Sequence, residues 1–212
     1  MERKENSKSV LKRLPGYLAY LKSLPEETYP YISATALANA LGMGEVQVRK
    51  DLAMVSDGGR PKIGYQRAHL IDDIEQFLGY DNTTDAVLIG AGKLGQALCG
   101  YSGFEAYGLN ILAAFDVNPV IDRTDDGKPV YPMTELQSFC RANKVLMGII
   151  TVPAKHAQEV CDQLIDSGIK AIWNFAPTHL EVPENILVQH ENMATSLAVL
   201  SMHLQAQIKE KK

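Results

Sequence analysis

The chain has 212 residues, of which 46% are hydrophobic and 22% are charged, close to the averages of globular proteins and unlike disordered chains. No apolar run reaches the length of about 18 residues that spans a bilayer, and the first residues lack the apolar stretch of a signal peptide. These features predict a cytoplasmic protein of two domains with no membrane segment.

Cysteine and charge usage narrow the function further. The three cysteines are far apart and the five histidines form no ligand pair, so the sequence predicts neither a disulfide framework nor a metal site. Residues 1–70 carry 11 Lys and Arg against 7 Asp and Glu, whereas from Asp81 onward there are 10 against 15. The N-terminal segment is mildly basic and the rest of the chain is acidic. This imbalance is compatible with nucleic-acid binding and also with chance, and only the motifs distinguish the two.

The first segment has helical periodicity. After a polar arm, apolar residues recur at helical spacing from Val10 to Leu24, and Pro25 is predicted to end this helix. Ser33 is the predicted N-cap of a second helix, and Gly42 supplies a tight bend after it.

A third helix is predicted from about residue 44. Its Val48, Leu52 and Val55 lie within a narrow arc that can pack inward. This spacing is typical of a helix-turn-helix, in which the second helix offers donors to phosphates and base edges, although an ordinary helical hairpin with a charged face has the same pattern. The predicted DNA-contacting residues of this helix are Gln47, Arg49 and Lys50, together with the cap Ser33.

The next stretch, SDGGRPKIGYQ, is rich in glycine and basic residues and leads into a further helical pattern, AHLIDDIEQFLGY. It fits the hairpin wing of a winged helix, and a polar loop is the alternative. Arg60 and Lys62 would then reach a minor groove or the DNA backbone, while Tyr65 packs at the base of the wing. Residues 1–80 are accordingly predicted to form a winged-helix DNA-binding domain.

Beyond a polar linker at residues 81–84, short apolar runs alternate with amphipathic helices, which predicts an α/β domain with a parallel sheet of Rossmann type over residues 81–190. Strands are expected at 86–89, 111–115, 145–152, 171–175 and 186–189, and helices at 93–101, 134–142 and 154–167.

A glycine-rich turn directly follows the first of these strands and opens a helix. Its six residues are Gly90, Ala91, Gly92, Lys93, Leu94 and Gly95. In this context the first glycine permits the tight turn, the second lets a pyrophosphate approach the backbone, and the third allows the helix to pack on the strand. The pattern predicts a dinucleotide-binding site.

Asp116 ends the second strand, where a carboxylate binds adenosine ribose hydroxyls and repels a 2′-phosphate. The sequence therefore favours NAD(H) over NADP(H). Two later strand ends should face the same crevice, although either could simply be a turn. Their candidate residues are Val152, Pro153, Asn174, Phe175, Ala176 and Pro177.

No general-acid setting for catalysis is evident. None of the nine tyrosines has a lysine four residues later, as a short-chain dehydrogenase requires, and no substrate domain follows the sheet. The last helix, expected at 192–209, carries an apolar stripe that suggests docking to a partner subunit. Residues 191–212 are therefore expected to serve dimerisation.

Taken together, these segments resemble the redox-sensing transcriptional repressors called Rex. The resemblance runs through RLPGYLAYL, ISATALANALGMGEVQVRKDL, VLIGAGKLGQAL, AAFDVNP, TVPAKHAQEVCDQLIDSGIKAIWNFAP and the closing helix. It implies a homodimer that binds a palindromic double-stranded operator, with NAD(H) in the Rossmann domain and the final helix swapped onto the other subunit. NADH would release the operator. It also places Tyr101 and the partner's Met193 near the nicotinamide.

The chain departs from the family in the wing and at a pair of positions. Many relatives have an Arg in the first helix and an Asp at the start of the swapped helix, where this chain has Ala19 and Asn192. Neither can form the ion pair that accompanies the cofactor switch. A Rex paralogue with an altered or weak redox response is thus one alternative. A small NAD-dependent oxidoreductase and a CoA-binding module are the others.

Overall fold

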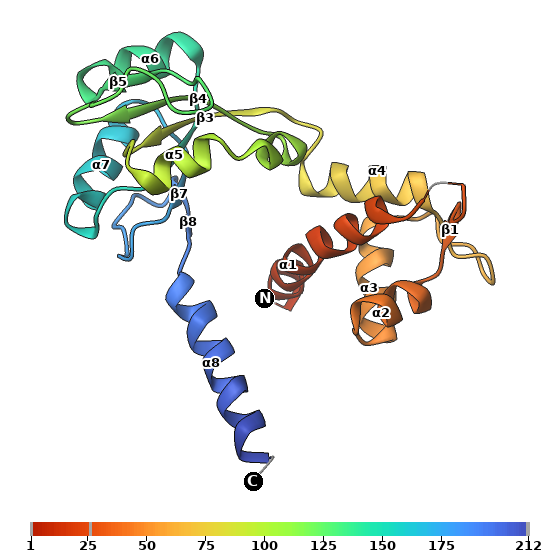
Figure 1. The fold of residues 1–212 in the computed structure, drawn as a ribbon. Coiled ribbons are helices and arrows are strands. Elements are labelled where there is room, and N and C mark those ends of the chain that lie inside the picture. Colours follow the sequence, from red (N-terminus) through yellow and green to blue (C-terminus); the bar gives the residue numbers. More distant parts are fainter. Residues whose placement is uncertain (1, 26, 211–212) are drawn as a thin grey trace. The chain divides into compact units, whose positions relative to one another are not determined.

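The computed structural model describes residues 2–25 and 27–210. The chain forms two compact units that divide between Asn82 and Thr83, two residues beyond the boundary expected from the sequence. Figure 1 labels helices and strands of both units.

The first unit is built from four helices and one short antiparallel pair of strands. Its elements are α1 (Glu2–Ser23), β1 (Tyr31–Ile32), α2 (Ala34–Leu41), α3 (Glu45–Val55), β2 (Tyr65–Gln66) and α4 (Arg67–Leu78). One apolar core joins all four helices, with Leu14 and Leu18 from α1, Leu37 from α2, Leu52 from α3 and Ile74 from α4 fully or almost fully buried. The helix-turn-helix is therefore one packed body, because each helix contributes its apolar stripe to the same core.

Helix α1 is longer than predicted. The expected polar arm is helical from Glu2, and Pro15 lies inside the helix. The helix ends at Ser23, where the buried Arg67 of α4 donates from Nη1 to the carbonyl oxygens of Leu21 at 2.9 Å and Leu24 at 3.2 Å. These contacts satisfy carbonyl groups that the end of a helix leaves without an internal partner.

The second unit holds a six-stranded sheet in which every neighbouring pair is parallel, in the order β5-β4-β3-β6-β7-β8. This is the doubly wound order of two mononucleotide-binding halves, so the predicted Rossmann-type α/β class is confirmed. The strands are β3 (Thr84–Ile89), β4 (Leu109–Asp116), β5 (Val130–Pro132), β6 (Met147–Ile150), β7 (Ala171–Asn174) and β8 (Leu187–His190).

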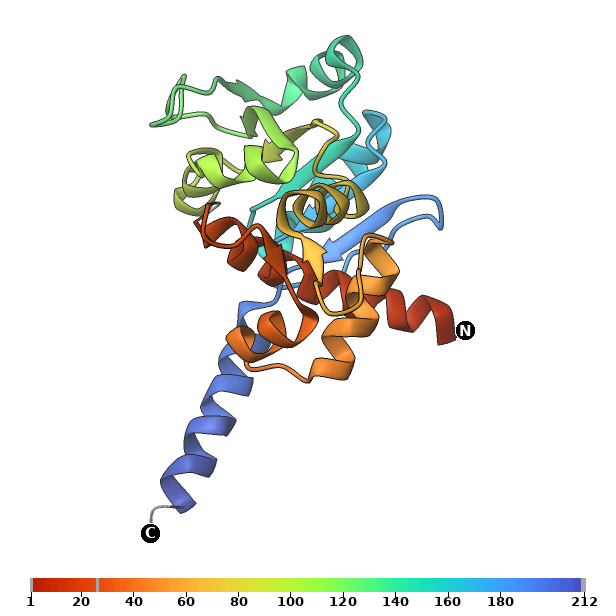
Figure 2. The same ribbon diagram turned by 90° about the vertical axis from the view of Figure 1, so that its right-hand side faces the viewer.

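Helices cover both faces of this sheet (Figures 1 and 2). Val87 and Ile89 of β3 pack in one apolar layer with residues of α6 (Leu136–Asn143) and α7 (Ala154–Asp166), whereas Ala86 and Leu88 pack in the other layer with Cys99 of α5 (Lys93–Cys99). Strand β3 is buried on both sides because its neighbouring side chains point to opposite faces.

Several element bounds differ from the predicted ones. The helix after the glycine-rich turn ends at Cys99, and a 3-10 helix, η1 (Ser102–Tyr107), follows it. A second 3-10 turn, η2 (Met133–Glu135), precedes α6. Strand β6 begins only at Met147, because the chain first closes α6 through a left-handed Lys144 and a bond from Val145 N to Cys140 O at 3.0 Å.

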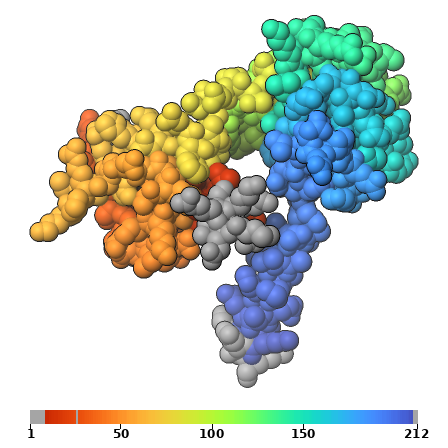
Figure 3. Space-filling model, turned by 180° about the vertical axis from the view of Figure 1, so that it is seen from behind, coloured from red at the N-terminus to blue at the C-terminus, as the bar shows by residue number. Residues whose placement is uncertain are grey.

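The last helix, α8 (Met193–Glu210), contributes nothing to the core: every residue from Met193 to Lys209 is exposed. It is the blue C-terminal segment of the space-filling view (Figure 3). Leu197, Leu200 and Leu204 are each more than half exposed. A helix with this much exposed apolar surface is typical of a protein interface.

Three free cysteines, Cys99, Cys140 and Cys161, are all buried in the second unit. Burial raises the pKa of each thiol to about 11. No helix among residues 2–25 and 27–210 is long and apolar enough to cross a membrane, and the same residues contain no group of three or more His, Cys, Asp or Glu placed to hold a metal ion.

Candidate functional site

The first candidate site is the outer surface of α3. Ser33 caps α2 by accepting a hydrogen bond from Ala36 N at 3.0 Å, and Gly42 ends that helix in the left-handed conformation with φ +63°. This turn sets the direction of α3, whose Val48 and Leu52 face the core as predicted while Val55 is half-buried. The residues left exposed on α3 include Gln47, Arg49 and Lys50.

One charge on this surface, that of Arg49, already has a partner in the protein. Arg49 forms an ion pair with Glu45 one turn earlier on α3, and both side chains are largely exposed. Such a surface pair contributes little to stability. The guanidinium can therefore exchange this partner for a phosphate or a base edge at small cost.

A wing follows α3 as predicted. Strands β1 and β2 pair with Ile32 opposite Tyr65, and Arg60 and Gly64 exchange both backbone hydrogen bonds at 2.9 Å. Lys62 lies at the tip with φ +66°, and Arg60 and Lys62 are both exposed.

Two glycines let the wing fold tightly. A Cβ on Gly64 would lie 2.3 Å from Ile32 O, and Gly64 also has φ +91°. A Cβ on Gly59 would lie 2.8 Å from Cζ of Tyr65, so this ring packs directly against the wing backbone. Tyr65 therefore lies where the sequence placed it, at the base of the wing.

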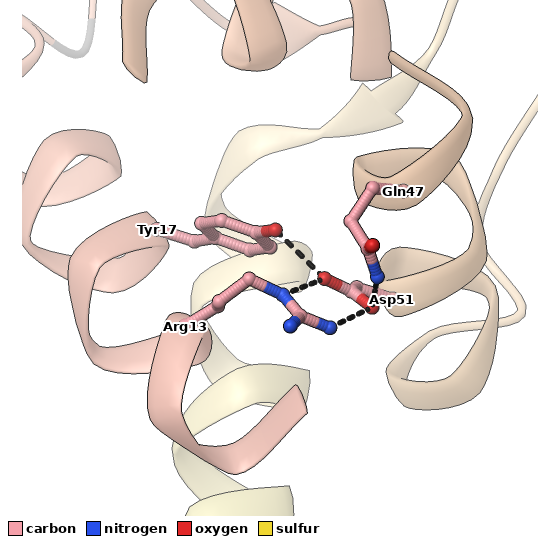
Figure 4. Close-up of polar contacts among 4 residues, drawn as sticks. All are labelled: Arg13, Tyr17, Gln47 and Asp51. Atoms are coloured by element: carbon pink, nitrogen blue, oxygen red, sulfur yellow. Dashed lines mark hydrogen bonds and ion pairs between the residues drawn. The ribbon is translucent and has the colours of Figure 1, made fainter. Parts of the chain in front are cut away.

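Sequence reasoning missed a buried cluster beneath this surface. The side chain of Asp51 in α3 is 2% exposed and receives hydrogen bonds from Arg13 and Tyr17 of α1 and from Gln47 of α3 (Figure 4). The partners lie 38, 34 and 4 residues away along the chain. Only the last of these spacings is a helical repeat visible in a sequence.

The second candidate site lies at the carboxyl edge of the sheet, beside the ends of β3 and β6. Gly90 has φ +105°, and a Cβ there would lie 2.9 Å from Thr151 Oγ1. A Cβ on Gly95 would lie 1.9 Å from Gly90 O. The first glycine is thus required by its backbone conformation and by the loop that follows β6, and the third by close packing of α5 on β3 and the turn after it. A Cβ on Gly92 would meet nothing within 4 Å.

A cavity of about 360 Å³ opens beside this turn. Five predicted residues line it, namely Gly90, Gly92, Asp116, Val152 and Pro153. It also has apolar walls at Val117, Met133 and Val160, and a row of α7 residues that were not among the predicted site residues, namely His156, Glu159 and Gln163. These three follow each other at spacings of three and four residues, so one helical face supplies them.

The surroundings of this cavity fit an adenine dinucleotide. The open space above Gly92 admits a pyrophosphate next to the first backbone N–H groups of α5, which have no partner within the helix. Asp116 is available at the end of β4 for ribose hydroxyls, and the apolar walls suit an adenine ring. Lys93 and Leu94 are exposed in the first turn of α5, and Ala91 is half-buried in the turn itself.

The predicted residues after β7 form a separate group. Asn174 is fully buried, and its side chain fixes the following loop: Oδ1 accepts from Ala176 N at 2.9 Å, and Nδ2 donates to Thr178 O at 3.0 Å. Ala176 and Pro177 line a second cavity, of about 350 Å³, together with His179, His190, Glu191 and Asn192.

Tyr101 and Met193 lie outside both cavities. Tyr101 is 53% exposed and begins a chain of ring contacts that runs through Phe104 and Trp173 to Phe175, with centroid distances of 4.8, 5.5 and 4.7 Å. It therefore belongs to the same side of the sheet as the loop after β7. Met193 is 72% exposed at the start of α8, where Asn192 Oδ1 accepts from Thr195 N at 3.2 Å.

A winged helix in one chain with a glycine-rich dinucleotide turn defines a class of proteins: DNA-binding regulators with a Rossmann-type sensing domain. Family models agree with this division. One described as the N-terminus of a putative DNA-binding protein matches residues 7–53, and one described as a CoA binding domain matches residues 81–178.

Whole-chain comparisons give the family. The redox-sensing transcriptional repressors Rex of Porphyromonas gingivalis and Treponema denticola are each 42% identical to this chain, covering 90% and 91% of it and 88% and 92% of their own lengths. The Rex of Clostridium botulinum is 39% identical over 98% of this chain and 100% of its own. The chain belongs to the Rex family, as the sequence resemblance predicted.

Solved structures of RSP, a Rex-family repressor, have the same fold. Its complex with β-NAD+ and operator DNA matches with a TM-score of 0.87 at 34% identity, covering 96% of this chain and 94% of that one. Its complex with β-NADH matches with a TM-score of 0.84 at 33% identity, covering 96% and 97%.

Proposed function

We propose that this protein is a transcriptional repressor that binds a palindromic operator through its winged helices and releases it when NADH occupies the Rossmann domain. The observation that carries the proposal is the joining of two sites in one chain of the Rex family: the exposed basic surface of α3 and the wing, and the cavity between Gly92 and Asp116. The RSP complexes with operator DNA and with NADH support both halves. The site of action would be the cytoplasm, and the role regulatory rather than enzymatic.

A homodimer is part of the proposal. The exposed apolar residues of α8 require a cover, and a second copy of the chain, with the helix swapped between subunits, would supply it. Two winged helices fixed in a dimer must match two half-sites, so a modest rotation of the cofactor domains would misplace them. NADH would then act through its differential affinity for the two arrangements.

The direct test is a fluorescence-polarisation titration of a palindromic operator of Rex type against the apo protein, repeated with saturating NADH and with saturating NAD+. We expect tight binding that NADH abolishes and NAD+ leaves in place. Binding that neither cofactor changes would contradict the sensing half of the proposal, and no binding to any operator would contradict the DNA-binding half.

The match to the CoA binding model supports one second candidate, a domain that binds CoA in place of NAD(H). Asp116 opposes it, because the ribose 3′-phosphate of CoA would meet a carboxylate at the end of β4. Titration calorimetry with CoA and with NADH separates the two: heat from CoA alone would overturn the assignment to NAD(H).

A weakened redox response is the other variant of the proposal. Ala19 is exposed on α1 and has no charge, and Asn192 is occupied as the N-cap of α8. The ion pair expected from relatives is therefore absent from the switch. Operator release by NADH comparable to that of relatives, with NAD+ ineffective at saturation, would contradict a weakened response.

A further inference from the structure

Asp51 lies on the helix proposed to enter the major groove, yet its carboxylate is turned toward the core. Oδ2 accepts from Arg13 Nε at 2.7 Å and from Tyr17 Oη at 2.7 Å. Oδ1 accepts from Arg13 Nη2 at 2.8 Å and from Gln47 Nε2 at 3.2 Å (Figure 4). Because a carboxylate has about four acceptor positions, these four bonds fill it.

The carboxylate is ionised at neutral pH. Burial raises the pKa of Asp51, but the hydrogen bonds from Arg13, Tyr17 and Gln47 outweigh burial and hold the pKa below its ordinary value of 3.8. An ionised carboxylate accepts hydrogen bonds and donates none. The end of the Gln47 amide that faces Asp51 must therefore be the NH₂ group, whatever else surrounds that side chain.

The contact with Asp51 fixes which atoms of the Gln47 amide face away from the protein. Gln47 is the third residue of α3, exposed in the helical turn that a recognition helix presents to base edges. A free glutamine amide can rotate and exchange its donor and acceptor ends. With Nε2 committed to Asp51, the carbonyl Oε1 is the outward acceptor, and one N–H of Nε2 is still unused by this contact.

We propose that Asp51 is a positioning residue for base recognition: it holds the Gln47 amide so that the recognition helix selects a base with an amino group in the major groove. Adenine (N6) and cytosine (N4) carry such a group, and adenine also offers N7 to the second hydrogen of Nε2. Guanine and thymine present an acceptor at the same place. This inference rests on the proposed DNA-binding function.

The first arm of the test uses base analogues that lack only the amino group. Fluorescence polarisation compares operators in which each half-site adenine is replaced by purine, or each cytosine by 2-pyrimidinone. At one position we expect the wild-type chain to bind about tenfold more weakly, and the Gln47→Met variant to show no change there. If no position has this effect, or if Gln47→Met shows the same tenfold loss, the proposal is wrong.

The second arm separates orientation from folding. In Asp51→Asn the amide both donates and accepts, so Gln47 loses its fixed direction, and the tenfold preference should fall to about twofold or less. Tyr17→Phe is the matched control: it removes one bond to Oδ2, leaves the bond between Oδ1 and Gln47, and should keep the preference. Circular dichroism verifies that each variant is folded.

The outcomes are distinct. Uniformly weaker binding of Asp51→Asn to all operators, with the preference intact, would show a purely structural role and overturn the proposal. Should Asp51→Asn fail to fold, the base-analogue arm still decides, because it needs only the wild type and Gln47→Met. A wild-type chain that binds none of the operators overturns the proposed function itself.

Discussion

Asp116 Oδ2 accepts a hydrogen bond from the backbone amide of Ala91 at 2.9 Å, which ties the end of β4 to the glycine-rich turn after β3. The other oxygen, Oδ1, accepts from Asn118 N at 3.0 Å. One carboxylate therefore shapes both loops at the edge of the cavity, and its remaining lone pairs are available to a bound ribose.

This geometry predicts that Asp116→Asn alters cofactor choice more than structure. The Asn carbonyl oxygen can still accept from Ala91 N, so the glycine-rich turn should persist, although the amide nitrogen cannot accept from Asn118 N. The charge that repels a 2′-phosphate is gone. We expect the preference for NADH over NADPH to fall about tenfold, an effect of about 1.4 kcal/mol. Calorimetric titration of both cofactors measures it, and an unchanged preference would contradict the role given to Asp116.

Two glycines of the same turn should behave in opposite ways. A Cβ at Gly92 would meet nothing within 4 Å beyond the adjoining residues, so Gly92→Val should fold normally yet block NADH by filling the space of the pyrophosphate. A Cβ at Gly95 would lie 1.9 Å from Gly90 O, so Gly95→Ala should lower the thermal midpoint. Thermal unfolding and cofactor fluorescence distinguish the two defects. Normal NADH binding by folded Gly92→Val would mean that the cofactor site is misplaced.

DNA binding should depend on Arg49 and Lys50 in different ways. Arg49→Ala removes a base-edge candidate, so specific binding should weaken by about 1–3 kcal/mol while NADH affinity stays constant. Lys50→Ala should weaken all sequences alike and reduce the slope of log K against log salt by about 0.9. Titrations at several salt concentrations measure both, and Glu45→Gln controls for loss of the Glu45–Arg49 pair. Equal loss of NADH binding in Arg49→Ala would point to unfolding.

The buried carboxylate of Asp51 should make stability dependent on pH in the acid range. Its pKa is lower in the folded state than its ordinary value of 3.8, so its contribution is complete above pH 3.8 and is lost as the pH falls through the folded-state pKa. We expect Asp51→Asn to be less stable than the wild type at pH 7, with the difference shrinking below about pH 4. Urea unfolding of both proteins at pH 7 and again below about pH 4 tests this. Asp57→Asn, an exposed carboxylate of the wing, is the control.

Restoring the two charges that many relatives carry at positions 19 and 192 should increase the difference in operator affinity between the NAD+ and NADH complexes. Ala19 is exposed, so Ala19→Arg costs no core packing, and Asn192→Asp keeps an oxygen that can cap α8. We expect the double variant to raise the ratio of operator affinities with NAD+ and NADH at least about fivefold. Each single variant, carrying one charge without its partner, should change the ratio less. No change in the double variant would show that these positions do not take part in the switch.

The sequence predicted the organisation well wherever a local pattern carried it. The inward face of α3, the wing around Tyr65 and the glycine turn all depend on residues close together in the chain. Strand β5 (Val130–Pro132) was not predicted, because three residues ending in proline give too short a pattern at the edge of a sheet.

Other features depend on contacts between distant residues. Ala86 pairs with Ile111 but Val87 pairs with Ala113, so Leu112 is an extra residue in β4. The bulge changes which side chains face each layer, and a simple alternation of apolar residues cannot show it. The bonds from Arg13 to Asp51 join two helices across 38 residues. Because of this separation along the chain, the Asp51 cluster could not be predicted from the sequence either.

The buried cysteines have a consequence for how such a protein would read redox state. Thiolates, not thiols, react with peroxides and disulfides, and the pKa of about 11 keeps Cys99, Cys140 and Cys161 protonated at neutral pH. Their burial also keeps oxidants away from the sulfur atoms. In the folded state the thiols are thus unreactive, so a transient rise in peroxide would not oxidise them. The redox signal would be the reversible binding of a diffusible nucleotide. DNA binding would therefore return to its earlier level as soon as the ratio of NADH to NAD+ did.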